Sequence, residues 1–348
     1  MHGAFRLHAH PLTPQPRQRI MPIQTGTCAP PRGADQGVSL LVHGGAWDIP
    51  DEECDDHLDG LHAALERGRA LLLDGAPALE VVAETVAVME AHGAFDAGRG
   101  AVLNRDGEVE LDAGLMDGET LAYGAVASVR RLPHPIRVAR TLLEQGAGAA
   151  RILAGAGAER FAAEHGFALV ENHELICPRE RARYERLKAR GRSHPSDAFI
   201  PPSFEGTPQG TVGCVARDRA GRLAAATSTG GTPYRPPGRI GDSPLPGAGY
   251  YAADAAAASA TGWGEAITAM LLCGRAVDRV ALGREPGAVL ADGLRQMHDR
   301  IRNPVGAGAT GGLILMTRQG AGFWAFSTPR MARGGWQEGG EPWAEVCR

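Results

Sequence analysis

The sequence predicts an α+β fold, a four-layer α-β-β-α sandwich of two mostly antiparallel sheets. The chain has 348 residues and 43% hydrophobic composition, which is enough for one large domain with a sizeable core. Apolar runs recur as strand, glycine-bearing turn and strand, with helical patterns between these units. Two strand patterns, TVGCVA and GLILMT, are apolar on both faces, as expected when two sheets face each other beneath covering helices.

The predicted elements follow one another in a regular order. Strands are expected at 38–43, 101–103, 108–111, 211–217, 222–227, 312–317 and 322–326. Helices are expected at 55–74, 77–91, 135–145, 149–165, 179–190, 264–273 and 286–301. The longest interior stretch without either pattern is 191–209, and loops of this length are usually functional or disordered.

Composition excludes several classes of protein. The net charge of −4 indicates no strong attraction to nucleic acid or to an anionic membrane. Six widely spaced cysteines are typical of reduced thiols in a cytoplasmic protein, and no apolar run reaches about 18 residues. Residues 1–36 are interpreted as a disordered tail, in which Met21 is an alternative start, before a single domain at 37–348.

Gly210 and Thr211 stand where the long loop enters a strand. If the peptide bond before Thr211 is broken, the new α-amino group, with an ordinary pKa of about 7.7–8.0, becomes a base beside the threonine hydroxyl. Gly210 suits an acyl shift because it tolerates strained backbone, and a flexible linker at 191–210 lets the new ends separate. These residues alone leave open that Thr211 simply begins a strand.

Longer motifs resemble the plant-type asparaginase and isoaspartyl peptidase family of N-terminal-nucleophile hydrolases. The block QGTVGCVARDRAGRLAAATSTGGTPYRPPGRIGDSPLPGAGYYA carries most of the resemblance. LLVHGGAW, FDAGRGAVLNRDGEVELDAGLMDGETLAYGAVASV, HPIRVAR, ATGWGE and GATGGLILM extend it in family order from about residue 38 to residue 336. The resemblance implies the N-terminal-nucleophile hydrolase fold and an autoprocessing amidohydrolase that releases L-aspartate from β-aspartyl dipeptides and L-asparagine.

The resemblance also implies roles for individual residues. Thr211 matches the nucleophile, supported by Thr229, and cleavage after Gly210 would give an α-subunit of 1–210 and a β-subunit of 211–348. The remaining matches are Arg239 and Asp242, which clamp the substrate's α-carboxylate and α-ammonium, and Thr261 and Gly262, which stabilise the oxyanion. A guanidinium and a carboxylate at fixed separation suit such a zwitterion.

Simpler interpretations of these matches remain open at this point. Arg239 and Asp242 could pair with each other in a turn, and Thr261 could be the N-cap of the helix that follows it. His43, in VHGGA, has no catalytic role in the family and is expected to pack at a strand end. The glycines beside it are expected to permit close backbone approach.

The resemblance further implies a homodimer of αβ units and no cofactor for the chemistry. The loop at 87–99 resembles one that wraps a structural Na⁺ or K⁺ ion with backbone carbonyls. Asp96 stands in this loop where the family usually has Asn, and it is expected to affect substrate binding because an ionised carboxylate only accepts hydrogen bonds.

Two other functions compete with the leading prediction. A glycosylasparaginase-type amidase would share the nucleophile, although it favours a secreted chain with disulfides. An unprocessed, non-catalytic homologue that acts as a binding protein is kept open by Asp96.

Overall fold

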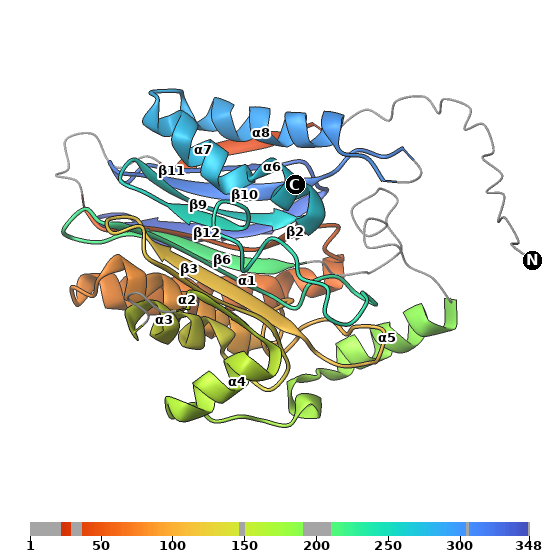
Figure 1. Cartoon of the computed structure of the whole chain (residues 1–348). Helices are drawn as coiled ribbons and strands as arrows, with labels where there is room; N and C mark the ends of the chain where they lie inside the picture. Colours follow the sequence, from red (N-terminus) through yellow and green to blue (C-terminus); the bar gives the residue numbers. More distant parts are fainter. Residues whose placement is uncertain (1–21, 29–36, 146–149, 191–209, 304–305, 347–348) are drawn as a thin grey trace, which may run out of the picture.

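Two sheets lie face to face between two outer layers of helices in the computed structural model (Figure 1). The structure describes residues 22–28, 37–145, 150–190, 210–303 and 306–346. The expected four-layer arrangement is therefore confirmed. None of the described helices is long and apolar enough to cross a membrane.

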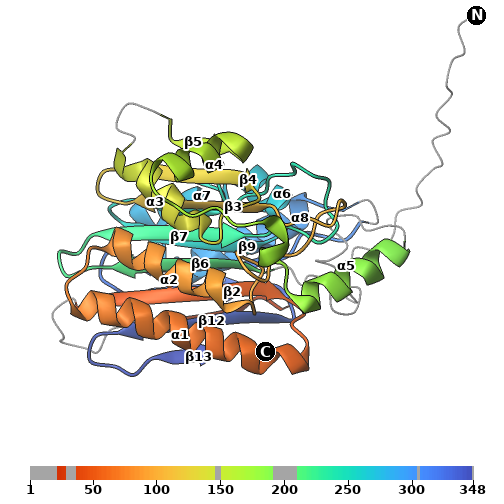
Figure 2. The same cartoon turned by 90° about the horizontal axis from the view of Figure 1, so that it is seen from below.

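The larger sheet carries most of the chain. Its strands, in spatial order, are β13 (Trp343–Glu345), β12 (Arg330–Gln337), β2 (Ser39–Trp47), β6 (Thr211–Arg217), β7 (Leu223–Thr229), β3 (Leu111–Asp117), β4 (Tyr123–Val129) and β5 (Ile152–Ala154). All neighbours are antiparallel except β4 and β5. Its outer face is covered by α1 (Cys54–Leu73), α2 (Ala78–His92), α3 (Pro135–Gln145) and α4 (Gly155–Glu164) (Figure 2).

The smaller sheet faces the larger one. Its strands, in spatial order, are β1 (Gln24–Cys28), β11 (Gly322–Phe326), β10 (Gly311–Thr317), β9 (Ala256–Gly262) and β8 (Tyr250–Ala252). Its outer face is covered by α6 (Gly264–Met270), α7 (Leu272–Ala281) and α8 (Pro286–Arg300). The remaining elements are η1 (Asp51–Glu53), η2 (Asn172–Leu175) and α5 (Pro178–Arg190), which projects from one end of the sandwich (Figure 1).

Strand alternation separates the core into layers. In β6, Val212 and Cys214 point toward the helices, whereas Val215 points into the layer between the sheets. In β9 of the other sheet, Ala260 faces its helices and Ala257 faces the same middle layer. Because successive side chains alternate, the position of any side chain between the sheets follows from its parity along the strand.

Several predicted elements require correction. Part of the expected disordered tail is strand β1, which pairs with β11 about 300 residues later, so no local pattern signals it. The expected helix at 264–273 is interrupted at Leu271, whose φ of 47° ends α6 before α7 begins. The expected helix at 149–165 begins only at Gly155, because β5 precedes it.

The first expected strand pair is reduced to a single bridge between Leu103 and Val109. The other two pairs form as β6–β7 and β10–β11. The expected linker over 191–209 lies outside the described residues, and Gly210 is the first described residue after it.

Candidate active site

Three threonine side chains meet in the layer between the two sheets. Thr211, the first residue of β6, lies directly opposite Thr229, the last residue of β7, and their Oγ1 atoms are 3.2 Å apart. Thr261, near the end of β9 in the other sheet, places its Oγ1 3.4 Å from the backbone nitrogen of Thr211. All three residues are buried, so little water competes for the hydrogen bonds of their hydroxyls. Thr211 therefore begins a strand, and threonine hydroxyls lie beside both its own hydroxyl and its backbone nitrogen.

The peptide before Thr211 lies tightly against the two glycines that follow His43. Gly45 has a φ of 111°, and a Cβ on it would lie 2.6 Å from the Cα of Gly210. The carbonyl oxygen of Gly44 lies 3.1 Å from the place of a Cβ on Gly210. The expectation that these glycines permit close backbone approach is therefore confirmed.

His43 is buried against the backbone of Thr211 rather than merely packed at a strand end. Its Nδ1 lies 2.8 Å from the Thr211 carbonyl oxygen and its Nε2 lies 2.8 Å from the Ser259 hydroxyl. Because a carbonyl only accepts, Nδ1 carries the proton and Nε2 accepts from Ser259. Burial lowers the pKa of His43 to about 3, so the ring is neutral near pH 7. Gly213 makes room for it, since a Cβ there would lie 2.3 Å from Nε2.

Arg239 and Asp242 converge on Gly264 at the start of α6. A Cβ on Gly264 would lie 2.9 Å from Nη2 of Arg239 and 2.8 Å from Oδ1 of Asp242. Arg239 does not pair with Asp242 in a turn, because its Nε and Nη2 donate to the two carboxylate oxygens of Glu265 at 2.8 and 2.7 Å. Burial opposes ionisation of Glu265, yet the hydrogen bonds from Arg239 lower its pKa.

Asp242 is a buried carboxyl that lacks a partner at one oxygen. Only 4% of the residue is exposed, and no described residue hydrogen-bonds to its Oδ2. Burial raises its pKa to about 7, although the positive charge of Arg239 opposes that rise. A carboxylate held in this way gains most from a cationic ligand group, which would supply the missing partner.

Thr261 and Gly262 belong to strand β9 and not to the helix after it. Trp263 is the N-cap residue of α6, so the interpretation of Thr261 as the N-cap is wrong. Gly262 has a φ of 132°, and a Cβ on it would lie 2.5 Å from the Cα of Gly311. The strand end therefore requires glycine at this position.

The chain is similar to known proteins over most of its length. A family model described as asparaginase matches residues 36–344. The chain belongs to the asparaginase family. Its relatives include the isoaspartyl peptidase of Salmonella typhimurium, 39% identical over 317 residues, which are 89% of this chain and 98% of that protein. The isoaspartyl peptidase/L-asparaginase of Danio rerio is 36% identical over 301 residues, 86% of this chain and 92% of the relative. The plant-type L-asparaginase of Pyrobaculum calidifontis is 36% identical over 311 residues, 88% and 99% of the two chains.

Asp96 is the departure from the asparaginase family pattern noted in the sequence. Its Oδ1 accepts a hydrogen bond from the Val102 N–H at 2.9 Å, whereas no described residue bonds to its Oδ2. Burial raises its pKa well above the ordinary value, and the bond from Val102 opposes this only in part. A carboxyl that stays protonated can donate as well as accept, as an amide does. Asp96 contacts Gly230, the residue after Thr229.

The loop at 87–99, expected in the asparaginase family to wrap a cation, gathers main-chain oxygens. A Cβ on Gly100 would lie 2.6 Å from the carbonyl oxygen of Gly93 and 2.8 Å from that of Phe95. A Cβ on Gly98 would lie 2.5 Å from the carbonyl oxygen of Glu90. Both glycines have positive φ, so the loop can curl and turn its carbonyls inward. Each of these oxygens already accepts one hydrogen bond, that of Gly93 from Arg179, that of Phe95 from Ala97 and that of Glu90 from Arg99. A carbonyl oxygen has two lone pairs, so a bound cation would have to use the second one.

Sequence reasoning missed the charged residues beneath the clamp. Glu265 stood within the quoted ATGWGE motif, so its pairing with Arg239 had a signal. Arg235, Glu110 and Asp112 also stand within quoted blocks, but Arg235 meets the two acidic residues across more than 120 residues of sequence, so no local pattern shows their contact.

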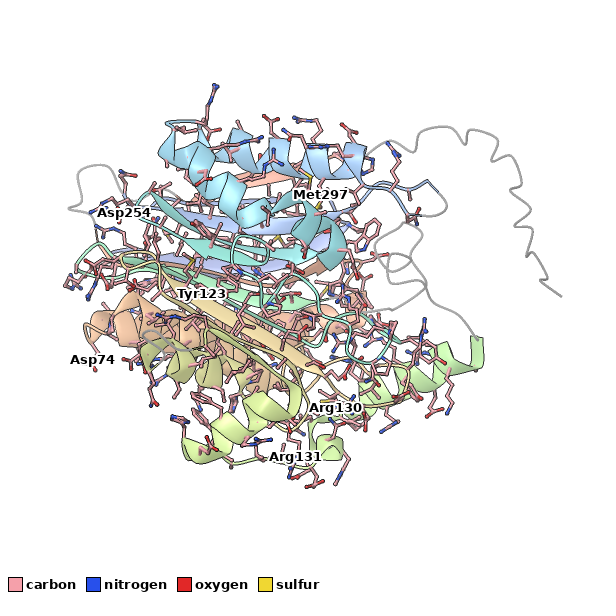
Figure 3. All side chains as sticks on the ribbon, viewed as in Figure 1. Asp74, Tyr123, Arg130, Arg131, Asp254 and Met297 are labelled. Carbon is pink, nitrogen blue, oxygen red and sulfur yellow. The ribbon has the colours of Figure 1, made fainter. Side chains whose placement is uncertain are left out.

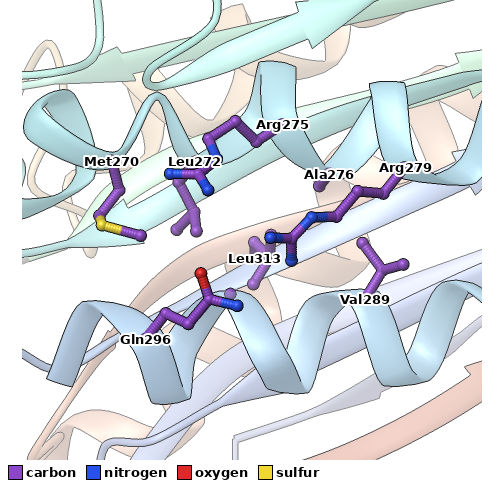
Figure 4. Close-up of a pocket in the computed structure, with 9 residues that line it drawn as sticks. Met270, Leu272, Arg275, Ala276, Arg279, Val289, Gln296 and Leu313 are labelled. Carbon is purple, nitrogen blue, oxygen red and sulfur yellow. The ribbon is translucent and has the colours of Figure 1, made fainter. Parts of the chain in front are cut away.

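Two pockets in the structure lie away from the threonines. One lies between α7 and α8, where Arg275, Arg279 and Gln296 extend over an apolar floor (Figure 4). The other includes Asp254, at the end of the sandwich opposite Arg130 (Figure 3).

Proposed function

We propose that this protein is an autoprocessing amidohydrolase that cleaves L-asparagine and β-aspartyl dipeptides, with Thr211 as an N-terminal nucleophile. The names of its relatives, isoaspartyl peptidase and L-asparaginase, support the substrate class. One observation carries the mechanism: the buried Thr211 hydroxyl lies 3.2 Å from that of Thr229, beside the constrained peptide after Gly210.

Maturation would use this hydroxyl on the chain itself. Thr211 Oγ1 attacks the carbonyl carbon of Gly210, the C–N bond breaks, and the leaving nitrogen takes a proton to become the α-amine of Thr211. Water then hydrolyses the resulting ester and returns the hydroxyl. The products are a carboxylate on Gly210 and a free amine close to Thr261 Oγ1.

Turnover would repeat the same attack on a substrate. The α-amine of Thr211 takes the hydroxyl proton, and Oγ1 bonds to the side-chain carbonyl carbon of the substrate. Thr261 and the N–H of Gly262 would donate to the developing oxyanion, each donor being worth roughly 10²–10³ in rate. Ammonia or an amino acid leaves with a proton, and water releases L-aspartate from the ester.

Recognition would depend on the clamp beside Gly264. Glu265 occupies Nε and Nη2 of Arg239, so Nη1 is left for the substrate's α-carboxylate. Oδ2 of Asp242, which accepts no hydrogen bond from the described part of the chain, would accept from the α-ammonium. Gly264 follows Thr261 by three residues, which span at most about 10 Å, so the clamp lies beside the strand end that carries Thr261.

Three further features belong to the same proposal. The carbonyls of the 87–99 loop would hold a structural Na⁺ or K⁺ ion that takes no part in the chemistry. The mature protein would be a homodimer of αβ units. It would work in the cytoplasm, which suits the free thiols of the five described cysteines.

The test combines maturation with a substrate panel. The purified chain, incubated without protease, should convert to 1–210 and 211–348, and the smaller fragment should begin Thr-Val-Gly-Cys. The mature protein should release ammonia from L-asparagine and aspartate from a β-aspartyl dipeptide, more rapidly than it cleaves a glycosylated asparagine. A chain that stays intact and inactive would instead support a binding protein, and an intact chain that hydrolyses asparagine would overturn the maturation step.

A further inference from the structure

We propose that Arg235 is a positioning residue for the substrate clamp, because it holds the backbone of Arg239 from beneath. This inference rests on the proposed function and extends it to a residue that would not contact the substrate. Arg235 heads the fully buried side chains by volume, with 1% of the residue exposed. Burying a guanidinium without partners costs free energy, so the groups that Arg235 contacts indicate its structural role.

Arg235 donates from its two terminal nitrogens to two backbone carbonyls. Nη1 donates to the carbonyl oxygen of Arg239 at 2.9 Å, and Nη2 donates to that of Glu110 at 2.5 Å. The first bond fixes the clamp residue itself and the second ties it to the large sheet just before β3. The planar fork of a guanidinium can make both bonds at once, whereas a lysine ammonium on its flexible stem cannot match that geometry.

Glu110 holds the same loop from the other side of Arg239. Its two carboxylate oxygens accept from the Gly238 N–H at 3.2 and 3.0 Å. Arg130, labelled in Figure 3, donates to the same carboxylate at 3.1 and 2.7 Å. The N–H of Gly238 and the carbonyl of Arg239 are thus both fixed, which leaves the peptide between them little freedom to move.

The charge of Arg235 also connects the clamp with the threonines. Its Nη1 lies 3.8 Å from Oδ2 of Asp112, an oxygen to which no described residue hydrogen-bonds. Asp112 lies directly opposite Thr229 in the pairing of β3 with β7, and Thr229 lies opposite Thr211. Arg235 therefore lies between two parts of the site. On one side are the paired ends of β3, β7 and β6, which include Thr229 and Thr211, and on the other is the loop that contains Arg239.

Space for the guanidinium is provided by Gly231. A Cβ at that position would lie 2.2 Å from Nη1 of Arg235, and its φ of 85° already favours glycine. Glycine at position 231 therefore leaves the space that the guanidinium of Arg235 occupies. Movement of Arg235 would displace the Arg239 backbone and, with it, the guanidinium that meets the substrate carboxylate.

The experiment compares Arg235→Lys with a matched control, Arg217→Lys. Arg217 is also buried and donates to two backbone carbonyls, but at the opposite end of β6 from Thr211. We expect Arg235→Lys to mature normally and to raise KM for L-asparagine about tenfold or more, with kcat changed less than about threefold. Arg217→Lys should change the melting temperature by a similar amount and leave KM as in the wild type.

A double-variant cycle separates positioning from a general structural role. If Arg235 acts through Arg239, Arg235→Lys should not lower kcat/KM further once Arg239→Ala is present. An equal loss of kcat/KM in both backgrounds would overturn the proposal. Should Arg235→Lys fail to fold, Gly231→Ala decides, because a Cβ there would lie 2.2 Å from Nη1 of Arg235 and would displace the guanidinium. An unchanged KM in a folded Gly231→Ala protein would then overturn it.

The wild-type protein distinguishes failure of this inference from failure of the proposed function. Calorimetric binding of L-aspartate and hydrolysis of L-asparagine are measured first. If the mature protein does neither, the proposed function is wrong and this role falls with it. If it does both and Arg235→Lys keeps the wild-type KM, only the role of Arg235 is overturned.

Discussion

The candidate site has two parts, a row of three threonines and the proposed substrate clamp, and the two are stabilised in different ways. Thr211, Thr229 and Thr261 are neutral groups at the ends of three strands, and their positions follow from sheet register. Arg239 and Asp242 come from a loop, and their positions depend on charged neighbours such as Glu265. The positions of the three threonines are determined mainly by backbone pairing, whereas the positions of Arg239 and Asp242 depend on a balance of buried charges.

This difference predicts different responses to substitution. The Thr211 hydroxyl can be removed with little loss of stability, because the ladder hydrogen bonds between β6 and β7 remain. Removal of the Arg239 charge leaves Glu265 without its hydrogen-bond partner, whereas removal of the Asp242 charge takes away a carboxylate that burial disfavours. Variants of the row should therefore separate chemistry from folding, whereas variants of the clamp should change recognition and stability together.

The largest expected effect is that of Thr211→Ala. It should leave a folded, uncleaved chain, because both acyl transfers lose their attacking atom. Turnover of L-asparagine should fall by at least about 10³-fold, as expected for loss of a nucleophile. Gel mobility, circular dichroism and ammonia release measure cleavage, fold and activity. An active, uncleaved variant would break the assignment of the threonine row.

Thr211→Ser is the matched control for that variant. It keeps the hydroxyl and should retain cleavage and turnover at a reduced rate, because the methyl group no longer restricts the χ1 rotamer. If serine and alanine gave the same complete loss, the methyl contact rather than the hydroxyl would be the essential feature.

The next largest effect concerns Asp242→Asn and pH. The folded-state pKa of about 7 lies above the ordinary value of 3.8, so folding takes up a proton between these limits. The carboxyl therefore costs stability progressively as the pH rises through that window. In the uncleaved Thr211→Ala background, the free energy of unfolding of the Asn form should exceed that of the Asp form by a difference that grows to about 4 kcal/mol near pH 7.

Urea unfolding at several pH values measures this difference. It should be near zero at the acid end, rise with pH and then level off. A difference that stays constant with pH would mean that Asp242 is already ionised in the folded chain, and the clamp would be a preformed ion pair.

A smaller effect is expected for Arg239→Ala. It should lower kcat/KM for L-asparagine by a factor that corresponds to about 1.5–3 kcal/mol, because one charge-assisted pair with the substrate is lost. Maturation should continue, since the cleaved peptide carries no free α-carboxylate beside the clamp. Glu265→Gln is the companion variant, because it frees the guanidinium without removing it. A wild-type kcat/KM for Arg239→Ala would remove Arg239 from the clamp.

The difference between backbone pairing and buried charge also explains which parts of the site the sequence could predict. The threonine row was predictable because strand periodicity, the GTVG and TSTGG motifs and the family resemblance all point to the same strand ends. The apolar strands on both faces likewise predicted the facing sheets. These features are local or periodic, so short windows of sequence contain them.

The support of the clamp was not predictable in this way. Arg235 bonds to the backbone of Glu110, which lies 125 residues before it, and their encounter depends on the packing of β3 beneath the loop. Strand β1 was missed for the same reason, because its partner β11 comes from the other end of the chain. Neither pairing leaves a pattern that a short window can contain.

The smallest expected effect is that of Asp96→Asn, the change toward the usual family residue. Burial raises the pKa of Asp96 and so favours the protonated carboxyl, which resembles the amide in shape and in hydrogen bonding. The amide would keep an acceptor for the Val102 N–H and supply N–H where the acid has O–H. We expect kcat/KM to stay within about threefold of the wild type at neutral pH. Asp96→Ala should lose roughly 1–3 kcal/mol of stability, because the Val102 N–H is left without a partner.

The pH profile of kcat/KM provides the decisive measurement. If Asp96 is neutral, the Asn variant keeps the acid limb that the α-amine of Thr211 produces. If Asp96 is ionised instead, removal of its negative charge would lower the pKa of that amine and move the acid limb to lower pH.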